Sequence, residues 1–401
     1  MKSIPYGKQN ITDNDIEAVV NTLHADFLTQ GPKIAEFEKA FAEYIGCEYA
    51  VAVSNGTAAL HLSAMALNVK PGQKVITTPI TFAASANCVK YCGGEVVFAD
   101  IDPDTYLINF ESVEKLIRSS PKGTYAGIIP VDFSGRAVDL EKFRALADQH
   151  GLWILEDACH APGGFFTDKD GNKQNCGNGK FADLAIFSFH PVKHIACGEG
   201  GMITTNSKEL YERLLVLRTH GITRDKEIFN NSATWAAGNA KEEVTDFPAW
   251  YMEMQELGYN YRLTDFQAAL GISQLKKADA GLRRRREIAK KYSVAFKDME
   301  WMHGQSGFVD GHAYHLYVIE TEDRLGLYNF LRSKNIFPQV HYIPAHLMPY
   351  YKAQGYGIGD FPNAEKYYSR CLSLPMYPTL TGEEQDYVID CILNFFKSSK
   401  K

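Results

Sequence analysis

The feature that most constrains this chain is a regular alternation of short apolar runs and helical patterns between residues 48 and 205. The runs predict strands at 49–54, 74–77, 95–99, 125–131, 152–156, 184–188 and 201–205, and the segments between them predict helices at 56–66, 81–92, 110–117 and 139–149. Strands that alternate with helices form a mainly parallel sheet with helices on both faces. Ligands of such sheets bind at the carboxyl ends of the strands. We therefore expect the functional residues at those strand ends.

The remaining sequence predicts two further parts. Residues 223–255 are polar but carry the aromatic cluster Phe247, Trp250 and Tyr251, which is typical of a long excursion at an active site or an interface. A helical pattern runs from 263 through the arginines at 283–286, and a strand at 314–320 and helices at 325–334 and 383–396 follow. We expect a large domain at 1–260 with an N-terminal arm, a linking helix at 261–300, and a small C-terminal domain at 301–401.

Composition narrows the function classes. The 401 residues are 45% hydrophobic and 22% charged, which fits a globular enzyme of two domains. The net charge of -6 argues against a broad basic surface for nucleic acid. The eight cysteines are scattered without a Cys-x-x-Cys pair, so no zinc ribbon, redox pair or other metal site is expected. With no apolar signal core and no run of 18 apolar residues, we expect a cytoplasmic protein without a membrane partner.

Lys193 is the first candidate for chemistry. It follows Ser188, the last residue of the predicted strand 184–188, and precedes the glycine-rich turn at 198–201. A lysine held in the crevice at a strand end loses hydration, which lowers its pKa. The neutral amine is the form that builds Schiff bases with carbonyl groups. The alternative is a solvated surface lysine, which is the usual environment of this residue.

Asp157 and His160 form the second candidate pair. Asp157 comes directly after the predicted strand 152–156. A carboxylate there can keep the pyridine nitrogen of a cofactor protonated, and His160 can contact the cofactor's ring oxygen. The alternative for Asp157 is an ordinary helix N-cap.

Two turns offer contacts for a phosphate and for a flat ring. A helix begins at Gly56 and Thr57 immediately after a strand, and the amides of such a helix start bind phosphate. The segment matches neither the P-loop nor the dinucleotide fingerprint. Phe82 stands where the strand 74–77 turns into the next helix and can stack on a flat ring. Each motif alone fits ordinary turn chemistry or core packing at least as well.

Together these pieces are the set that pyridoxal phosphate (PLP) requires, and they occur in order along one sheet edge. The series resembles the fold-type I PLP enzymes, and more closely the sugar aminotransferases of the DegT/DnrJ/EryC1/StrS family. The resemblance covers nearly the whole chain, through residues 28–31, 54–57, 156–158, 188–193, 198–201, 257–262, 339–344 and 373–375. It implies an α/β fold: a large αβα domain with a mainly parallel sheet, and a smaller C-terminal α+β domain.

The resemblance also implies residue roles. Lys193 corresponds to the catalytic Schiff-base lysine, Asp157 to the partner of the pyridine nitrogen, and His160 to the residue at the ring oxygen. The implied remaining cofactor contacts are Gly56, Thr57 and Ser188 at the phosphate and Phe82 on the ring. Asn260 corresponds to an asparagine that reaches the phosphate of the neighbouring subunit, which implies a homodimer with shared active sites. For Asn260, a helix N-cap is the alternative.

The substrate is a finer expectation from the same resemblance. Residues 314–317 and 339–342 and the aromatic-rich segment 247–251 look most like a subgroup that aminates C4 of a UDP-linked 4-keto-6-deoxy-2-acetamido sugar on the pseudaminic acid route, with L-glutamate as donor. The expected sugar contacts are His315, Tyr317, His341 and Tyr342, for which core packing is the alternative. A diphosphate needs cations, and the sequence offers Arg218, Arg224 and Arg262.

Three other functions stay open. The substrate can be another nucleotide-linked keto-sugar of the GDP-perosamine, UDP-bacillosamine or dTDP type. A second function is a PLP sugar dehydratase; in one such group histidine replaces the Schiff-base lysine, whereas Lys193 is retained here. A third is a ligand sensor without catalysis, which the presence of both Lys193 and Asp157 disfavours.

Overall fold

The computed structural model describes residues 3–239, 241–299, 302–305 and 309–398. Its centre is a seven-stranded sheet in the order β2-β10-β9-β6-β5-β3-β4. The strands are β2 (Tyr49–Val53), β3 (Lys74–Thr77), β4 (Glu95–Phe98), β5 (Tyr125–Ile129), β6 (Trp153–Asp157), β9 (Leu184–Ser188) and β10 (Gly201–Thr205). Only β10 is antiparallel to its neighbours in this sheet. The predicted mainly parallel sheet is therefore confirmed.

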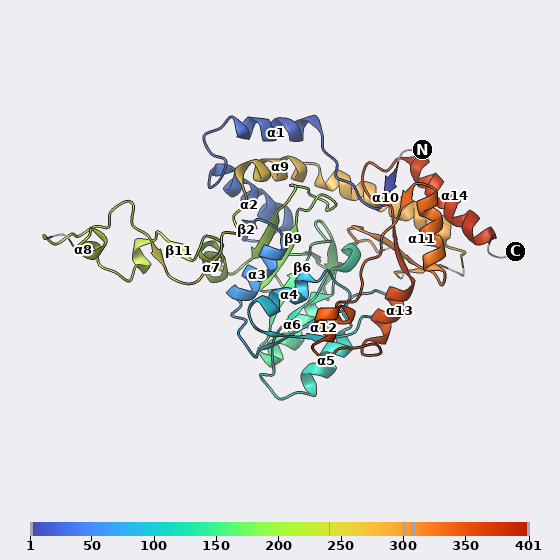
Figure 1. The fold of residues 1–401 in the computed structure, drawn as a ribbon, viewed down its shortest axis with the longest axis horizontal. Coiled ribbons are helices and arrows are strands. Elements are labelled where there is room, and N and C mark those ends of the chain that lie inside the picture. The colour runs from blue at the N-terminus through green and yellow to red at the C-terminus, as the bar shows by residue number, and fades with distance from the viewer. Residues whose placement is uncertain (1–2, 240, 300–301, 306–308, 399–401) are drawn as a thin grey trace.

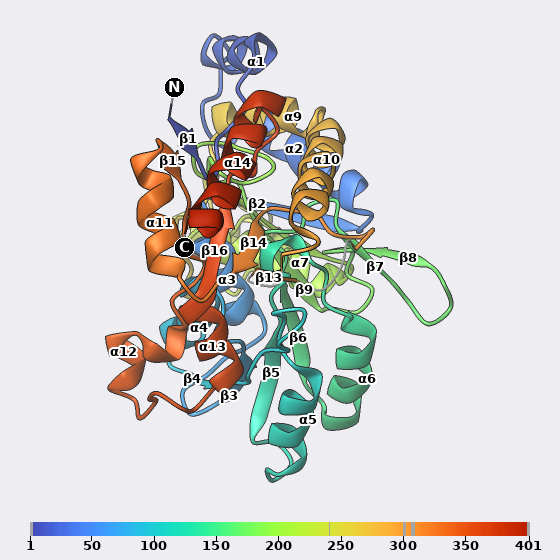
Figure 2. The ribbon, with the colours of Figure 1, turned by 90° about the vertical axis from the view of Figure 1, so that its right-hand side faces the viewer.

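Helices cover both faces of the sheet, as Figures 1 and 2 show. Side chains of a strand alternate between the faces, so Val75 and Leu155 pack with α3 (Gly56–Ala66), α4 (Ala84–Tyr91) and α7 (Lys208–Arg218). Their neighbours Ile76 and Ile154 pack with α5 (Phe110–Arg118) and α6 (Leu140–His150) on the opposite face. On that same face α2 (Pro32–Ile45) covers the β2–β9 end of the sheet. The sheet is thus buried on both sides, and its strand ends form the accessible edge.

The C-terminal part is built on a small antiparallel sheet of β13 (His303–Gly304), β14 (Tyr317–Glu320) and β16 (Cys371–Leu374). Helices α11 (Arg324–Ser333) and α14 (Gly382–Ser398) lie beside it, and β15 (Ile336–Phe337) pairs in parallel with β1 (Ile4–Pro5). The helical pattern after residue 263 forms two helices rather than one, α9 (Asp265–Leu275) and α10 (Ala278–Phe296). The three-part division by residue number stays our proposal.

The remaining elements are short or peripheral. Helix α1 (Asp13–Leu23) packs on α9. The others are the hairpin β7 (Phe165–Thr167) and β8 (Lys173–Asn175), the helices α12 (Pro349–Lys352) and α13 (Pro362–Arg370), and the 3-10 turns η1 (Phe133–Gly135), η2 (Lys226–Ile228) and η3 (Ala345–Leu347). In the part of the chain that the structure describes, no helix is both long and apolar enough to cross a membrane.

The polar excursion at 223–255 is an arm that extends away from the body of the molecule (Figure 1). Its base is the antiparallel pair β11 (Ile222–Thr223) and β12 (Glu253–Met254), and α8 (Ala233–Ala236) lies farther out. The buried carboxylate of Glu253 accepts hydrogen bonds from the backbone N–H groups of Asn230 and Asn231 at 2.7 and 2.9 Å. The arm is therefore internally ordered, yet Trp250 is 73% exposed and Met254 65% exposed.

Candidate active site

Lys193 lies in the turn after β9, at the carboxyl edge of the large sheet. Its backbone N–H donates to the carbonyl of His190 at 2.8 Å, which holds the turn. Burial lowers the pKa of Lys193; Cys159 and Asp157 act to raise it, and Arg285 acts to lower it. Among the described residues, no carboxylate forms a salt bridge with the amine. The lowered pKa increases the fraction of Lys193 that is a neutral amine, which is the nucleophile that Schiff-base chemistry needs.

Asp157 ends β6, which pairs directly with β9. Its side chain is 5% exposed and accepts a hydrogen bond from the Ser85 hydroxyl at 2.6 Å and another from the Cys159 backbone N–H at 3.2 Å. The Ser85 hydroxyl lies 2.7 Å from that of Thr81. No lysine or arginine in the described ranges forms a salt bridge with Asp157. A buried carboxylate without a cation suits the protonated ring nitrogen of PLP.

The start of α3 is the segment predicted to hold the phosphate of the cofactor. The Asn55 side chain caps the helix by accepting the Ala58 N–H at 2.8 Å, which fixes the first turn. Gly56 lies so close to the end of β9 that a Cβ there would stand 3.1 Å from the Ser188 Cβ. The amides of the first turn, which include those of Gly56 and Thr57, lack intrahelical partners and attract an anion. The residues therefore fit the phosphate of PLP.

His160 and Tyr342 form a hydrogen-bonded pair beside these groups. The Ser134 N–H donates to Nδ1 of His160 at 3.2 Å, which assigns the ring proton to Nε2. Nε2 lies 3.1 Å from the Tyr342 hydroxyl and donates to it. Burial lowers the pKa of His160 well below its ordinary value, and the charge of Lys193 adds to this effect. His160 is therefore a neutral imidazole of fixed tautomer.

Phe82 and Tyr342 flank an accessible face. Their ring centroids are 6.3 Å apart, and Phe82 is 64% exposed although it is a large apolar side chain. An exposed aromatic ring at a strand end is what a stacking partner for a flat cofactor requires. Phe82 is thus an exposed ring beside Tyr342, and stacking on the cofactor stays its predicted role.

The residues predicted to contact the sugar fall into two groups. His315 packs against His160 with ring centroids 4.3 Å apart and ring planes tilted by 38°, and its buried Nδ1 has no hydrogen-bond partner. His341 Nδ1 lies 2.8 Å from the Ser373 hydroxyl, and burial together with the Lys193 charge lowers the pKa of His341 to about 3. Tyr317 instead packs in the C-terminal core, with its hydroxyl 3.1 Å from that of Ser293. The structure thus brings His315, His341 and Tyr342 to the site, and sugar contact stays a prediction for all four.

Three residues of this site were not expected from the sequence. Ser85 holds Asp157, Ser134 sets the tautomer of His160, and Arg285 supports the segment that carries His315. Arg285 is 1% exposed, and its guanidinium donates to the carbonyls of Tyr314 and His315, both at 3.2 Å. Of these three residues, only Ser85 could have been found from the sequence, because a polar residue one helical turn after Phe82 faces the same strand end. Asn260, predicted to act in the neighbouring subunit, is exposed in the single chain.

Comparisons with known proteins agree with this geometry. A model of the DegT/DnrJ/EryC1/StrS aminotransferase family matches residues 9–393. The spore coat polysaccharide biosynthesis protein SpsC of Bacillus subtilis is 38% identical over 405 residues, which cover 99% of this chain and 98% of the relative. The UDP-4-amino-4,6-dideoxy-N-acetyl-beta-L-altrosamine transaminase of Campylobacter jejuni is 35% identical over 409 residues, 99% of both chains.

Solved structures extend the match to three dimensions. PseC of Helicobacter pylori, an aminotransferase of pseudaminic acid biosynthesis, superposes with a TM-score of 0.85 and 30% identity over 99% of this chain and 100% of its own. The sugar aminotransferase Spr1654 of Streptococcus pneumoniae superposes with a TM-score of 0.86 in both its PMP and its PLP form, at 27% and 26% identity over 98% and 99% of this chain and 99% of its own. The chain therefore belongs to the DegT/DnrJ/EryC1/StrS aminotransferase family and is a PLP-dependent sugar aminotransferase.

Proposed function

We propose that this enzyme transfers the amino group of L-glutamate to C4 of a UDP-linked 4-keto-6-deoxy-2-acetamido hexose, the reaction of an altrosamine transaminase in pseudaminic acid biosynthesis. The observation that carries the chemistry is the placement of Lys193 and Asp157 at the ends of the paired strands β9 and β6. The specific sugar is supported by the full-length similarity to the C. jejuni transaminase and to PseC.

The proposed proton transfers use groups whose charge states the structure favours. Bound PLP supplies an electron sink for the negative charge that develops at the reacting carbon. The Nζ of Lys193, with its lowered pKa, takes the proton from the α-carbon of glutamate and later delivers a proton to C4 of the sugar. Asp157 keeps the ring nitrogen protonated, because its buried carboxylate accepts two hydrogen bonds and forms no salt bridge with a lysine or arginine of the described ranges.

Tyr342 and two arginines are the proposed substrate contacts beyond the cofactor. Because Tyr342 accepts the proton of His160, its own hydroxyl proton is available for a ligand oxygen. Arg218 is engaged elsewhere, since it forms a salt bridge with Glu38 at 2.6 Å. Arg262, whose buried Nε has no partner, lies two residues after Asn260 and is the better candidate for the diphosphate, together with Arg224.

We propose a homodimer in which a second copy covers the arm and receives Asn260 at its cofactor phosphate. The arm supports this, because its residues Trp250 and Met254 are 73% and 65% exposed, and Leu257, just beyond the arm, is 71% exposed. Large apolar side chains gathered on one projection are typical of an interface.

The eight free cysteines support a reducing compartment, and we propose the cytoplasm.

The substrate proposal is tested with UDP-, GDP- and dTDP-linked 4-keto-6-deoxy sugars, each with and without the 2-acetamido group. Formation of 2-oxoglutarate and of the amino sugar is measured with glutamate as donor. We expect the highest kcat/KM for the UDP-linked 2-acetamido sugar. A preference for GDP or dTDP substrates refutes the UDP assignment but not the transamination, and product without 2-oxoglutarate points to a dehydratase.

A further inference from the structure

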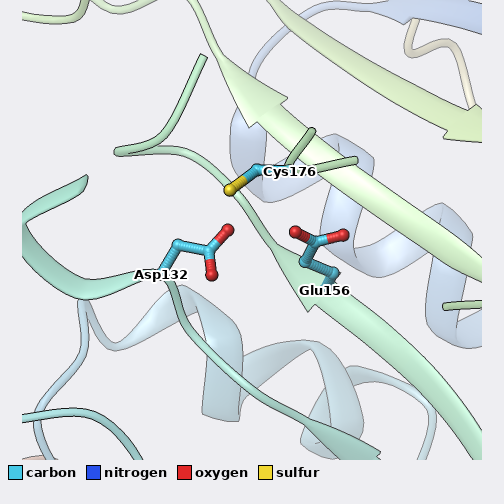
Figure 3. Close-up of side chains that lie close together, drawn as sticks. All are labelled: Asp132, Glu156 and Cys176. Carbon is cyan, nitrogen blue, oxygen red and sulfur yellow. The ribbon is translucent and has the colours of Figure 1, made fainter. Parts of the chain in front are cut away.

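Two carboxyl groups and a thiol meet directly behind the cofactor-binding edge. They belong to Asp132 after β5, Glu156 in β6, and Cys176 in the segment before β9. Their oxygen and sulfur atoms lie within 4.8 Å of one another, all three residues are buried, and the two carboxyl groups face each other (Figure 3). Because side chains alternate along β6, Glu156 points to the sheet face opposite that of Asp157. No lysine or arginine of the described ranges forms a salt bridge with either carboxyl group.

The hydrogen bonds of the two carboxyl groups indicate which oxygen of the pair can carry a proton. Glu156 Oε2 accepts the Gly177 N–H at 2.9 Å, and Asp132 Oδ1 accepts the Val138 N–H at 2.8 Å. Asp132 Oδ2 is buried and has no partner. Two buried carboxylates without a cation cannot both be ionised. A proton on the free oxygen of Glu156 removes one charge and gives Asp132 Oδ2 the donor that it lacks.

We propose that Asp132 and Glu156 share one proton at neutral pH, with Glu156 as the acid, and that this pair positions His160 and Asp157. Burial raises the pKa of Glu156 well above its usual value, and the neighbouring charge of Asp132 adds to it. Burial also raises the pKa of Asp132, to about 6. Among the described residues, the other ionisable groups near the pair are Asp157 and the thiols of Cys159 and Cys176, and none of them is a cation.

The pair is connected to the site through the loop 132–138. The backbone N–H of Asp132 donates to the Asp157 carbonyl at 3.0 Å. The Asp132 carboxylate accepts the backbone N–H of Val138, and this bond holds the two ends of the loop together. Within this loop Ser134 donates to Nδ1 of His160 and, through its hydroxyl, to the Leu316 carbonyl at 3.0 Å. A displaced Asp132 would therefore disturb the tautomer of His160 and the contact with the C-terminal part together. Asp132 and Glu156 are positioning residues, because they act through Asp157 and His160.

The proton itself is tested by difference infrared spectroscopy on the holoenzyme at neutral pH. We expect the carbonyl stretch of one protonated carboxylic acid in the wild type and its loss in Glu156→Gln. Asp168→Asn is the matched control: Asp168 is buried, but it accepts hydrogen bonds from Gln174 and Lys180 and is ionised. A wild-type spectrum identical to that of Glu156→Gln overturns the proposal.

The positioning role is tested by rescue. The amide of Glu156→Gln can donate to Asp132 as the acid does, so we expect kcat within about twofold of wild type and unchanged absorbance of the bound cofactor. Glu156→Ala leaves Asp132 without its donor, and we expect kcat to fall about tenfold or more, the scale of one hydrogen bond to a charged group. Equal kcat in the two variants overturns the positioning role.

Two further outcomes bear on the shared proton: a variant that does not fold, and a metal ion bound in place of the proton. If Glu156→Ala does not fold, the infrared comparison still decides whether the proton is shared. Cobalt(II) added to the holoenzyme distinguishes the proton from a metal ion: we expect no thiolate-to-metal absorption. A stoichiometric absorption that Cys176→Ala abolishes overturns the shared proton in favour of a metal site.

Discussion

Replacing Asp157 with asparagine tests the centre of the proposed chemistry. The change keeps the size of the side chain, and the amide oxygen can still accept a hydrogen bond from Ser85 or from the Cys159 N–H. It removes the negative charge that holds the ring nitrogen of the cofactor protonated. We therefore expect the fold and cofactor binding to persist while proton removal from the donor slows.

The size of the effect follows from burial. Asp157 is 5% exposed, so its charge acts with little screening by solvent. Breaking one partner out of a buried ion pair costs about 3–5 kcal/mol. Since each 1.36 kcal/mol is a factor of ten in rate, we expect the transfer to slow by about 10²–10⁴-fold.

The assay is the glutamate half-reaction in a single turnover, followed by the loss of absorbance of the lysine-bound cofactor. Asp168→Asn is the control, because it removes a buried carboxylate in the β7–β8 hairpin that bonds Lys180 and Gln174. Circular dichroism and thermal unfolding establish that both variants fold. A half-reaction of Asp157→Asn within a few-fold of wild type refutes the role of this carboxylate.

Three other outcomes are expected. Lys193→Ala should lose both the absorbance of the lysine-bound cofactor and turnover, and an unchanged spectrum would remove Lys193 from the mechanism. Mixing Lys193→Ala with Asn260→Ala chains should restore activity above both parents, since a mixed dimer has one intact site if Asn260 acts in its neighbour; no gain despite demonstrated heterodimers contradicts shared sites. Burial lowers the pKa of His160 and His315 well below the ordinary value, so the unfolded chain binds more protons below about pH 6.5 and the free energy of unfolding should fall there by up to about 1.4 kcal/mol per pH unit for each histidine. Denaturant titrations across that range measure this slope, and His315→Gln should reduce it.

The fold was predictable because the large sheet is made of local patterns. The apolar runs at β3, β5, β6 and β9 lie where the sequence predicts strands, and the fold class, the family and PLP are confirmed. The direction of β10 was not predictable, because an apolar run reads the same in a parallel and an antiparallel strand. The break between α9 and α10 falls at 276–277 without a glycine or proline to mark it.

The candidate site likewise contains residues whose positions could be predicted from the sequence and residues whose positions could not. The position of Asp157, Gly56 and Lys193 at the sheet edge was predictable because each comes at or after the end of a predicted strand, while their roles toward the cofactor stay predictions. Arg285 was not, since its acceptors are carbonyls at 314, 315 and 376, and no pattern in a helix indicates a carbonyl so distant in the chain. The shared-proton pair joins Asp132, in the loop after β5, to Glu156 in β6, and a single sequence does not show which acidic residues meet.

The parallel pairing of β1 with β15 has a consequence for the order in which the protein is made. Ile4 lies beside Ile336, so the first strand leaves the ribosome long before its partner exists. At about 5–20 residues per second, that interval is roughly 15 to 70 seconds. During this time the strands of the large sheet, all complete by residue 205, can already assemble. The N-terminal strand thus pairs only after the strands of the large sheet have been made, and a rigid N-terminal fusion should delay closure of the C-terminal part while leaving assembly of the sheet unchanged.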